Sequence, residues 1–190
     1  MTEGYFDEEH FKSQDFSTNP LVKGEYEGCV FGGCKFTRGN LTDVNFIDCE
    51  FVDCDLSNVK LSNTAFKNVS FKSCKMLGLH FEDCNKFLLE MRFENCTLDL
   101  SSFYQLSLKS TVFKNCSLQE VDFTESDLSR GQLINCDLAS AVFDRTNLQS
   151  VDLSSATNFN IDPENNNIKK AKFALGELQG LLVKYDILVK

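Results

Sequence analysis

Large apolar residues recur every five positions along most of the chain. Between 121 and 155 the sequence divides into the blocks VDFTE, SDLSR, GQLIN, CDLAS, AVFDR, TNLQS and VDLSS, each with Phe or Leu at its centre. A small residue stands two positions before each centre. An amphipathic helix has a period of about 3.6 and a half-buried strand a period of about 2, so a period of five indicates a repeat architecture.

The same period extends through most of the sequence, with one break. Centres follow in steps of five from Phe6 to Phe81 and again from Phe93 to Leu153, so two extra residues fall within 82–92. We expect a bulge at this interruption. In the first blocks the small position holds mostly polar residues, which predicts an atypical capping coil over 1–25, followed by regular repeats over 26–157.

A period of twenty lies within the period of five. Cysteines are repeatedly twenty residues apart, as are Cys29 and Cys49. Four blocks per turn predict a coil of square cross-section, in which each segment lies above the one twenty residues before it. Once the break is allowed for, one column contains a cysteine from each of six coils: Cys34, Cys54, Cys74, Cys96, Cys116 and Cys136.

Several blocks match a known consensus. CDLSN (54–58) and SDLSR (126–130) have a small residue, Asp or Asn, Leu or Phe, Ser or Thr, and then any residue. The sequence therefore resembles the pentapeptide-repeat family over about 26–155. This resemblance implies an all-β fold, a right-handed quadrilateral parallel β-helix of about seven coils, in which the central and small residues point inward.

The C-terminal segment, 158–190, has another pattern. Apolar residues recur at helical spacing from Phe173 to Leu182, and 186–189 alternates like a short strand. One interpretation is a helix that caps the open end of the coil, and the other is a helix that also forms a homodimer. The second predicts a dimer interface of Phe173, Leu178, Leu181, Leu182, Ile187 and Val189.

The cysteines follow the repeat. There are nine, an odd number, and no CxxC motif occurs. Each stands at the small position of a block, where other blocks have Ser, Thr, Val or Ala, so the position limits volume and does not require a thiol. Evenly spread thiols do not converge on a metal ion. We therefore expect reduced, buried cysteines, no metal site and no cofactor.

Residues suited to catalysis are scarce. The two histidines, His10 and His80, stand apart from any candidate nucleophile, and no phosphate-binding glycine loop occurs. The sequence therefore predicts a protein that is not an enzyme. No stretch has the pattern of a secretory leader or reaches membrane-spanning length, so we expect a cytoplasmic protein without a membrane partner.

Acidic residues are the remaining candidates for function. The formal net charge is -9, and the repeats over 26–158 contain 18 acidic and 12 basic residues. Once the break is allowed for, Asp43, Asp83 and Glu125 share one outward column, with Glu82 and Asp144 beside it. One interpretation is a solvated face, because Asp is also favoured in turns. The other is a face that binds a basic partner.

Within the family, the sequence is similar to the quinolone-resistance (Qnr-type) proteins in its length, acidity and apolar C-terminal segment. That resemblance implies a dimeric rod that mimics duplex DNA and binds DNA gyrase or topoisomerase IV. Many Qnr-type proteins have two long loops, whereas this sequence has only the two-residue break. The alternative is an interaction scaffold with an unrelated protein partner, since a fold does not fix a function. Direct binding of nucleic acid conflicts with the negative charge.

Overall fold

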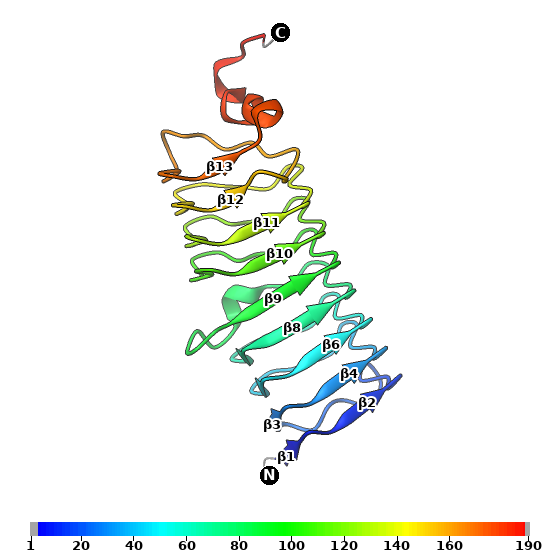
Figure 1. Cartoon of the computed structure of the whole chain (residues 1–190). Coiled ribbons are helices and arrows are strands. Elements are labelled where there is room, and N and C mark those ends of the chain that lie inside the picture. Colours follow the sequence, from blue (N-terminus) through cyan, green and yellow to red (C-terminus); the bar gives the residue numbers. More distant parts are fainter. Residues whose placement is uncertain (1–3, 189–190) are drawn as a thin grey trace.

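In the computed structural model, which describes residues 4–188, the chain winds into a parallel β-solenoid of about eight turns (Figure 1). The two ends of the chain lie at opposite ends of the resulting rod. The fold class expected from the repeat is therefore confirmed. The rod has about one turn more than the predicted seven, because the coil continues beyond Leu153.

Two parallel sheets form two of the sides. The first sheet contains four strands in the order β1 (Gly4–Asp7), β3 (Gly24–Glu27), β5 (Asn45–Ile47) and β7 (Ala65–Lys67). The second sheet extends along the whole rod and contains nine strands in the order β2 (His10–Lys12), β4 (Val30–Gly32), β6 (Glu50–Val52), β8 (Val69–Lys72), β9 (Met91–Glu94), β10 (Val112–Lys114), β11 (Gln132–Ile134), β12 (Asp152–Leu153) and β13 (Lys172–Phe173).

The strand register shows where the period is interrupted. Neighbouring strands pair residues twenty positions apart, as Phe11 pairs with Phe31, but β8 and β9 pair Phe71 with Phe93. The Asn85 N–H still donates to the Thr64 carbonyl, as in an unbroken coil, so the two extra residues lie within 85–90. A 3-10 turn, η1 (Phe81–Asp83), precedes this bulge, and the first sheet ends at β7 beside it.

The corners of the coil explain the polar residues of the repeat. The residue two positions after each centre adopts the left-handed region at most corners, for example Asp43 (φ 62°), Asn58 (φ 55°) and Asn115 (φ 53°). Asn, Asp and Gly tolerate this conformation better than other residues do. Their enrichment at this position therefore serves the turn.

The core is a set of stacked side chains. Phe31 is fully buried, and its ring stacks on Phe11 below and Phe51 above, with centroids 4.8 Å and 4.7 Å apart. Such offset or parallel ring pairs add to the gain from burial of the rings. Because each coil touches only its neighbours, stability accumulates along the stack rather than around one centre.

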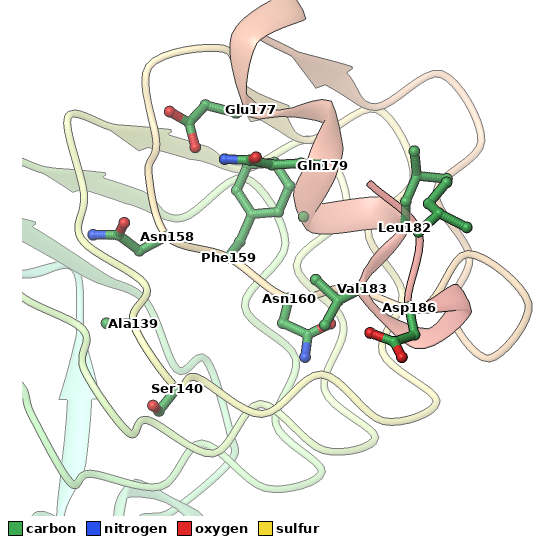
Figure 2. Close-up of a pocket in the computed structure, with 12 residues that line it drawn as sticks. Ala139, Ser140, Asn158, Phe159, Asn160, Glu177, Gln179, Leu182, Val183 and Asp186 are labelled. Carbon is green, nitrogen blue, oxygen red and sulfur yellow. The ribbon is translucent and has the colours of Figure 1, made fainter. Parts of the chain in front are cut away.

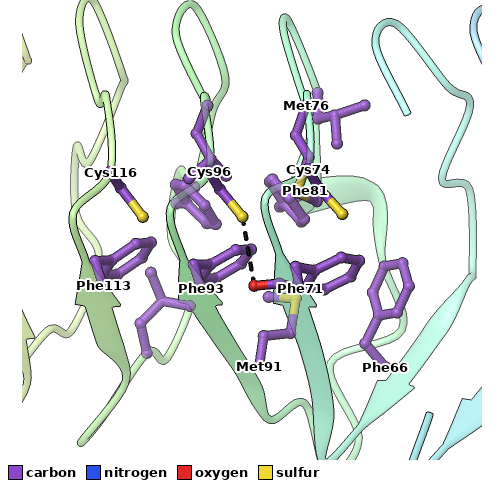
Figure 3. Close-up of a cluster of buried hydrophobic side chains, with 14 of the residues drawn as sticks. Phe66, Phe71, Cys74, Met76, Phe81, Met91, Phe93, Cys96, Phe113 and Cys116 are labelled. Atoms are coloured by element: carbon purple, nitrogen blue, oxygen red, sulfur yellow. Dashed lines mark hydrogen bonds between the residues drawn. The ribbon is translucent and has the colours of Figure 1, made fainter. Parts of the chain in front are cut away.

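The cysteines line this core, as predicted. All nine are buried and free. Figure 3 shows the column beside the phenylalanine rings, where the Cys96 thiol donates to the Phe71 carbonyl oxygen of the neighbouring coil at 3.4 Å. Burial also raises the pKa of the Cys49 thiol to about 12. The thiols thus fill small sites in the core, and eight of the nine donate to a backbone carbonyl oxygen.

The C-terminal segment differs from the prediction. The strand β13 comes before the helical turns, not after them, and pairs Phe173 with Leu153 of β12. Two 3-10 helices follow, η2 (Leu175–Leu181) and η3 (Val183–Tyr185), in place of the expected α-helical pattern. In the described part of the predicted strand over 186–189 no strand forms, and Val189 lies outside the described residues.

Two glycines lie within this C-terminal segment. Gly176 and Gly180 stand inside the segment, where glycine disfavours a helix. A Cβ atom on Gly180 would come within 2.3 Å of the Phe159 carbonyl oxygen, so this glycine allows the segment to lie close against the last coil.

Candidate functional site

The acidic column is the predicted outward column of Asp43, Asp83 and Glu125, with Glu82 and Asp144 beside it. Its lower half is a row of hydrogen-bonded polar side chains. Asp43 accepts from the Lys23 ammonium at 3.1 Å and from the Asn63 amide at 3.0 Å. The Asn85 amide then donates to the Asn63 side-chain oxygen at 3.2 Å. The hydrogen bond from Asn63, together with the Lys23 charge, lowers the pKa of Asp43. This carboxylate is therefore ionised, and it already has partners within the chain.

The upper half of the column is also paired. The Arg145 guanidinium binds Glu125 at 2.7 Å and Asp144 at 2.8 Å. The Gln105 amide donates to Glu125 as well, and these hydrogen bonds lower the Glu125 pKa. The structure therefore places Glu125 and Asp144 together, as predicted, around an arginine that the sequence analysis did not include.

The middle of the column differs from the prediction. The Asp83 carbonyl oxygen accepts from the Asn63 N–H, so its backbone lies next in the stack. The Asn63 side chain, however, is hydrogen-bonded to Asn85 and not to Asp83. Asp83 lies in the 3-10 turn, which interrupts the regular corner geometry of the coil. The Asp83 side chain is exposed, whereas Glu82 is 23% exposed and lies 3.0 Å from the His80 ring nitrogen.

The bulge exposes two large apolar side chains, four and five residues after Asp83 in the sequence. Phe87 is 69% exposed and Leu88 is 64% exposed. Neither was identified from the sequence, although both stand at the break in the period, where the inward rule no longer applies. A pair of exposed apolar side chains is suited to contact with a protein surface.

A hollow lies at the C-terminal end (Figure 2). It has a volume of about 590 Å³ and lies between the last coils and the two 3-10 helices. Figure 2 shows Phe159, Gln179 and Glu177 on one side and Val183 and Asp186 on another. Amide, carboxylate and apolar groups can bind a ligand or a protein segment, and no histidine or cysteine lines this hollow.

The predicted dimer residues divide into two groups. Phe173 is half-buried with its ring 5.4 Å from Phe159, and Leu181 packs against the core. These two residues cap the coil. Leu178 is 37% exposed and Ile187 is 55% exposed, while Leu182 is half-buried beside the hollow. The most exposed apolar residues at this end, Leu175 and Leu188, were not in the predicted set.

Residues 4–188 contain neither a metal-ligand cluster nor a membrane-spanning helix. No group of three or more His, Cys, Asp or Glu side chains in this part has an arrangement that could hold a metal ion. No helix within the same residues is long and apolar enough to cross a membrane.

Family comparisons agree with this architecture. Residues 25–103 match a model described as a pentapeptide repeat region, and residues 116–154 match one for pentapeptide repeats, so the matches together cover more than half of the chain. The chain belongs to the pentapeptide-repeat family. Among curated proteins no match is found.

Solved structures give a further comparison for this pentapeptide-repeat protein. One trypsin-treated form of QnrB1, described as a plasmid-mediated fluoroquinolone resistance protein, matches with a TM-score of 0.62 and 17% identity, covering 98% of this chain and 92% of QnrB1. A second trypsin-treated form matches with a TM-score of 0.50 and 16% identity, covering 98% of this chain and 100% of that one. At these identities the likeness establishes the fold.

Proposed function

We propose that this protein is a non-enzymatic binding protein whose acidic corner binds the basic, DNA-binding surface of a type II topoisomerase, either DNA gyrase or topoisomerase IV. The acidic corner consists of Asp43, Glu82, Asp83, Glu125 and Asp144. The observation that carries the proposal is the placement of Asp43 and Glu125 at equivalent corners of different coils, with Asp144 beside Glu125, together with the likeness of the rod to a fluoroquinolone resistance protein.

The charge density limits how closely the rod can imitate DNA. The repeats over 26–158 have a net charge of -6, since 18 acidic residues face 12 basic ones. With coils about 4.8 Å apart, this is roughly one net charge per coil, compared with one per about 1.7 Å along duplex DNA. Binding to a basic surface should therefore weaken with salt, but less steeply than binding of DNA does.

The bulge adds exposed apolar surface to the protein. Phe87 and Leu88 follow Asp83 by four and five residues and are exposed, so the bulge adds apolar surface that a partner can contact. Apolar contact is weakly dependent on salt and adds affinity that does not require a high density of carboxylates.

The test is a gyrase supercoiling assay with and without a fluoroquinolone. Wild-type protein is expected to alter supercoiling or to relieve the drug, and the variant Asp83→Lys/Glu125→Lys is expected to lose this effect. The variant Asp53→Lys/Glu120→Lys makes the same change of charge at two other exposed corners with φ of 53° and 56°, so it is the matched control. No effect and no binding by wild type at low salt would exclude the topoisomerase proposal.

A second candidate function is an interaction scaffold for another protein. The observation in its favour is that Asp43, Glu125 and Asp144 are already paired with Lys23 or Arg145, so part of the acidic corner is neutralised within the chain. Under this alternative, Phe87→Ser/Leu88→Ser abolishes partner binding, and charge reversal at the acidic corner leaves it unchanged.

Both candidates act in the cytoplasm. Nine free thiols support this placement, because reduced thiols persist in that compartment. Fractionation of the native cells, with detection of the protein in the soluble cytoplasmic fraction, tests it.

A further inference from the structure

The two ends of the rod differ in how they are covered. At the C-terminal end, η2 and η3 lie over the last coil, and Leu181 packs against the core. At the N-terminal end, within residues 4–188, β1 pairs only with β3 and β2 only with β4. Each therefore has a free edge, and free edges of sheets readily pair with another chain.

The open first coil also exposes aromatic rings. Phe6, Phe11 and Phe16 are each stacked on one side, with centroids 4.5 Å to 4.8 Å from the rings of the second coil. All three are half-buried, whereas Phe31 in the second coil is fully buried. The exposed apolar residues Tyr5 and Val22 lie at the same end. The aromatic side chains of the first coil thus pack against the second coil on one side and have no further coil on the other side within residues 4–188.

The charge of this end is negative. Residues 4–27 contain two lysines, of which Lys23 is paired with Asp43, and six carboxylates: Asp7, Glu8, Glu9, Asp15, Glu25 and Glu27. Glu8 and Glu9 are exposed and form no ion pair within the described residues.

The opposite end has two exposed lysines without an ion pair among residues 4–188, and it is apolar as well. Residues 168–188 contain two carboxylates and four lysines, of which Lys169 and Lys170 are exposed and have no ion pair in the part of the chain that the structure describes. Leu175 is 85% exposed and Leu188 is 91% exposed at this end. Ile187 and Leu188 lie outside every strand and follow the last 3-10 turn.

We propose that the rods associate end to end, with the C-terminal surface of one copy packed on the open first coil of the next. The C-terminal surface consists of Leu175, Leu178, Val183, Ile187 and Leu188 with the neighbouring Lys169 and Lys170. This contact brings lysines to glutamates and covers apolar surface on both sides. A two-fold contact between two C-terminal surfaces would instead bring lysines against lysines.

The geometry of such a contact determines the size of the assembly. The two surfaces are different and lie at opposite ends of the rod, so the contact is heterologous and leaves one surface of each terminal copy free for the next. Association therefore continues beyond the dimer as concentration rises, and it weakens with salt because charge contributes to it.

The experiment uses the full chain and two charge-reversed variants in sedimentation velocity. Wild type is expected to increase in average mass beyond a dimer with concentration. Glu8→Lys/Glu9→Lys and Lys169→Glu/Lys170→Glu each place like charges across the contact, so each alone is expected to associate at least about tenfold more weakly. An equimolar mixture of the two restores attraction at every contact and is expected to associate like wild type.

Controls separate this result from loss of folding and from a symmetric dimer. Asp53→Lys/Glu120→Lys changes the net charge equally and is expected to associate like wild type. Val22→Lys alters the same open end without touching the glutamates and is expected to weaken association. The proposal is overturned by a monomeric wild type, by a dimer that stays intact in Glu8→Lys/Glu9→Lys, or by a mixture that fails to associate.

Discussion

Phe71 stacks on Phe93 with ring centroids 5.3 Å apart and planes 9° apart, although these residues are separated by 22 positions and not by twenty. The stack therefore passes through the interruption without a gap. The two extra residues are expelled to the surface as the bulge, where Phe87 and Leu88 are exposed. The aromatic stack in the core thus remains continuous even where the five-residue spacing of the sequence is broken.

Deletion of Phe87 and Leu88 should leave the solenoid folded. The deletion returns the offset between β8 and β9 to twenty residues and removes two exposed apolar side chains that contribute little to the core. We expect an unchanged circular dichroism spectrum and a melting temperature equal to or above that of wild type. A collapse of the melting transition would show that the bulge itself stabilises the coil.

Phe123→Ala should destabilise the protein by roughly 3–5 kcal/mol, because the side chain is fully buried and the substitution leaves a cavity between coils. Its ring lies 5.4 Å from Phe103 and 5.3 Å from Phe143. Phe16→Ala, at the half-buried open end, is the control and should cost less. Urea unfolding of both variants measures the difference, and equal losses would contradict the layered core.

Native cysteines should react slowly with a thiol reagent at pH 8. All nine are buried, so a reagent in solution does not reach them in the folded state. In denaturant all nine thiols should react rapidly. Fast reaction of several thiols before unfolding would be inconsistent with the buried column.

Asp152 should contribute to stability above about pH 4 and lose that contribution in acid. Hydrogen bonds from Ser154, and the Lys172 ammonium at 3.1 Å, lower its pKa from 3.8 to about 2. Because the folded state holds fewer protons than the unfolded state, the contribution disappears as pH falls from about 4 to about 2. Urea midpoints over this range should fall less in Asp152→Asn than in wild type.

The regular coils could be predicted from sequence because one rule governs every layer. Phe31, Phe51 and Phe71 are buried for the same steric reason, so their spacing reveals the coil. The start of the last turn departs from that rule, since its first two central positions are Asn158 and Pro163, and Phe159 enters the core one position out of phase. Ile168 and Phe173 return to the period of five and pack against the core.

The candidate site was less predictable than the fold. The column was inferred from spacing, which gives the corner but not the rotation of a side chain. Spacing therefore identified Asp43 and Glu125 but not the bonds to Lys23 and Arg145 that neutralise them. The 3-10 turn at Phe81–Asp83 is likewise a local feature of the backbone that the five-residue spacing does not predict.

Contact of each coil only with its neighbours makes the length of the rod an independent variable. Insertion or removal of twenty residues within the regular repeats adds or removes one layer, about 4.8 Å of length, and leaves every other contact in place. The distance between the two unlike ends of the rod is therefore proportional to the number of twenty-residue coils in the sequence.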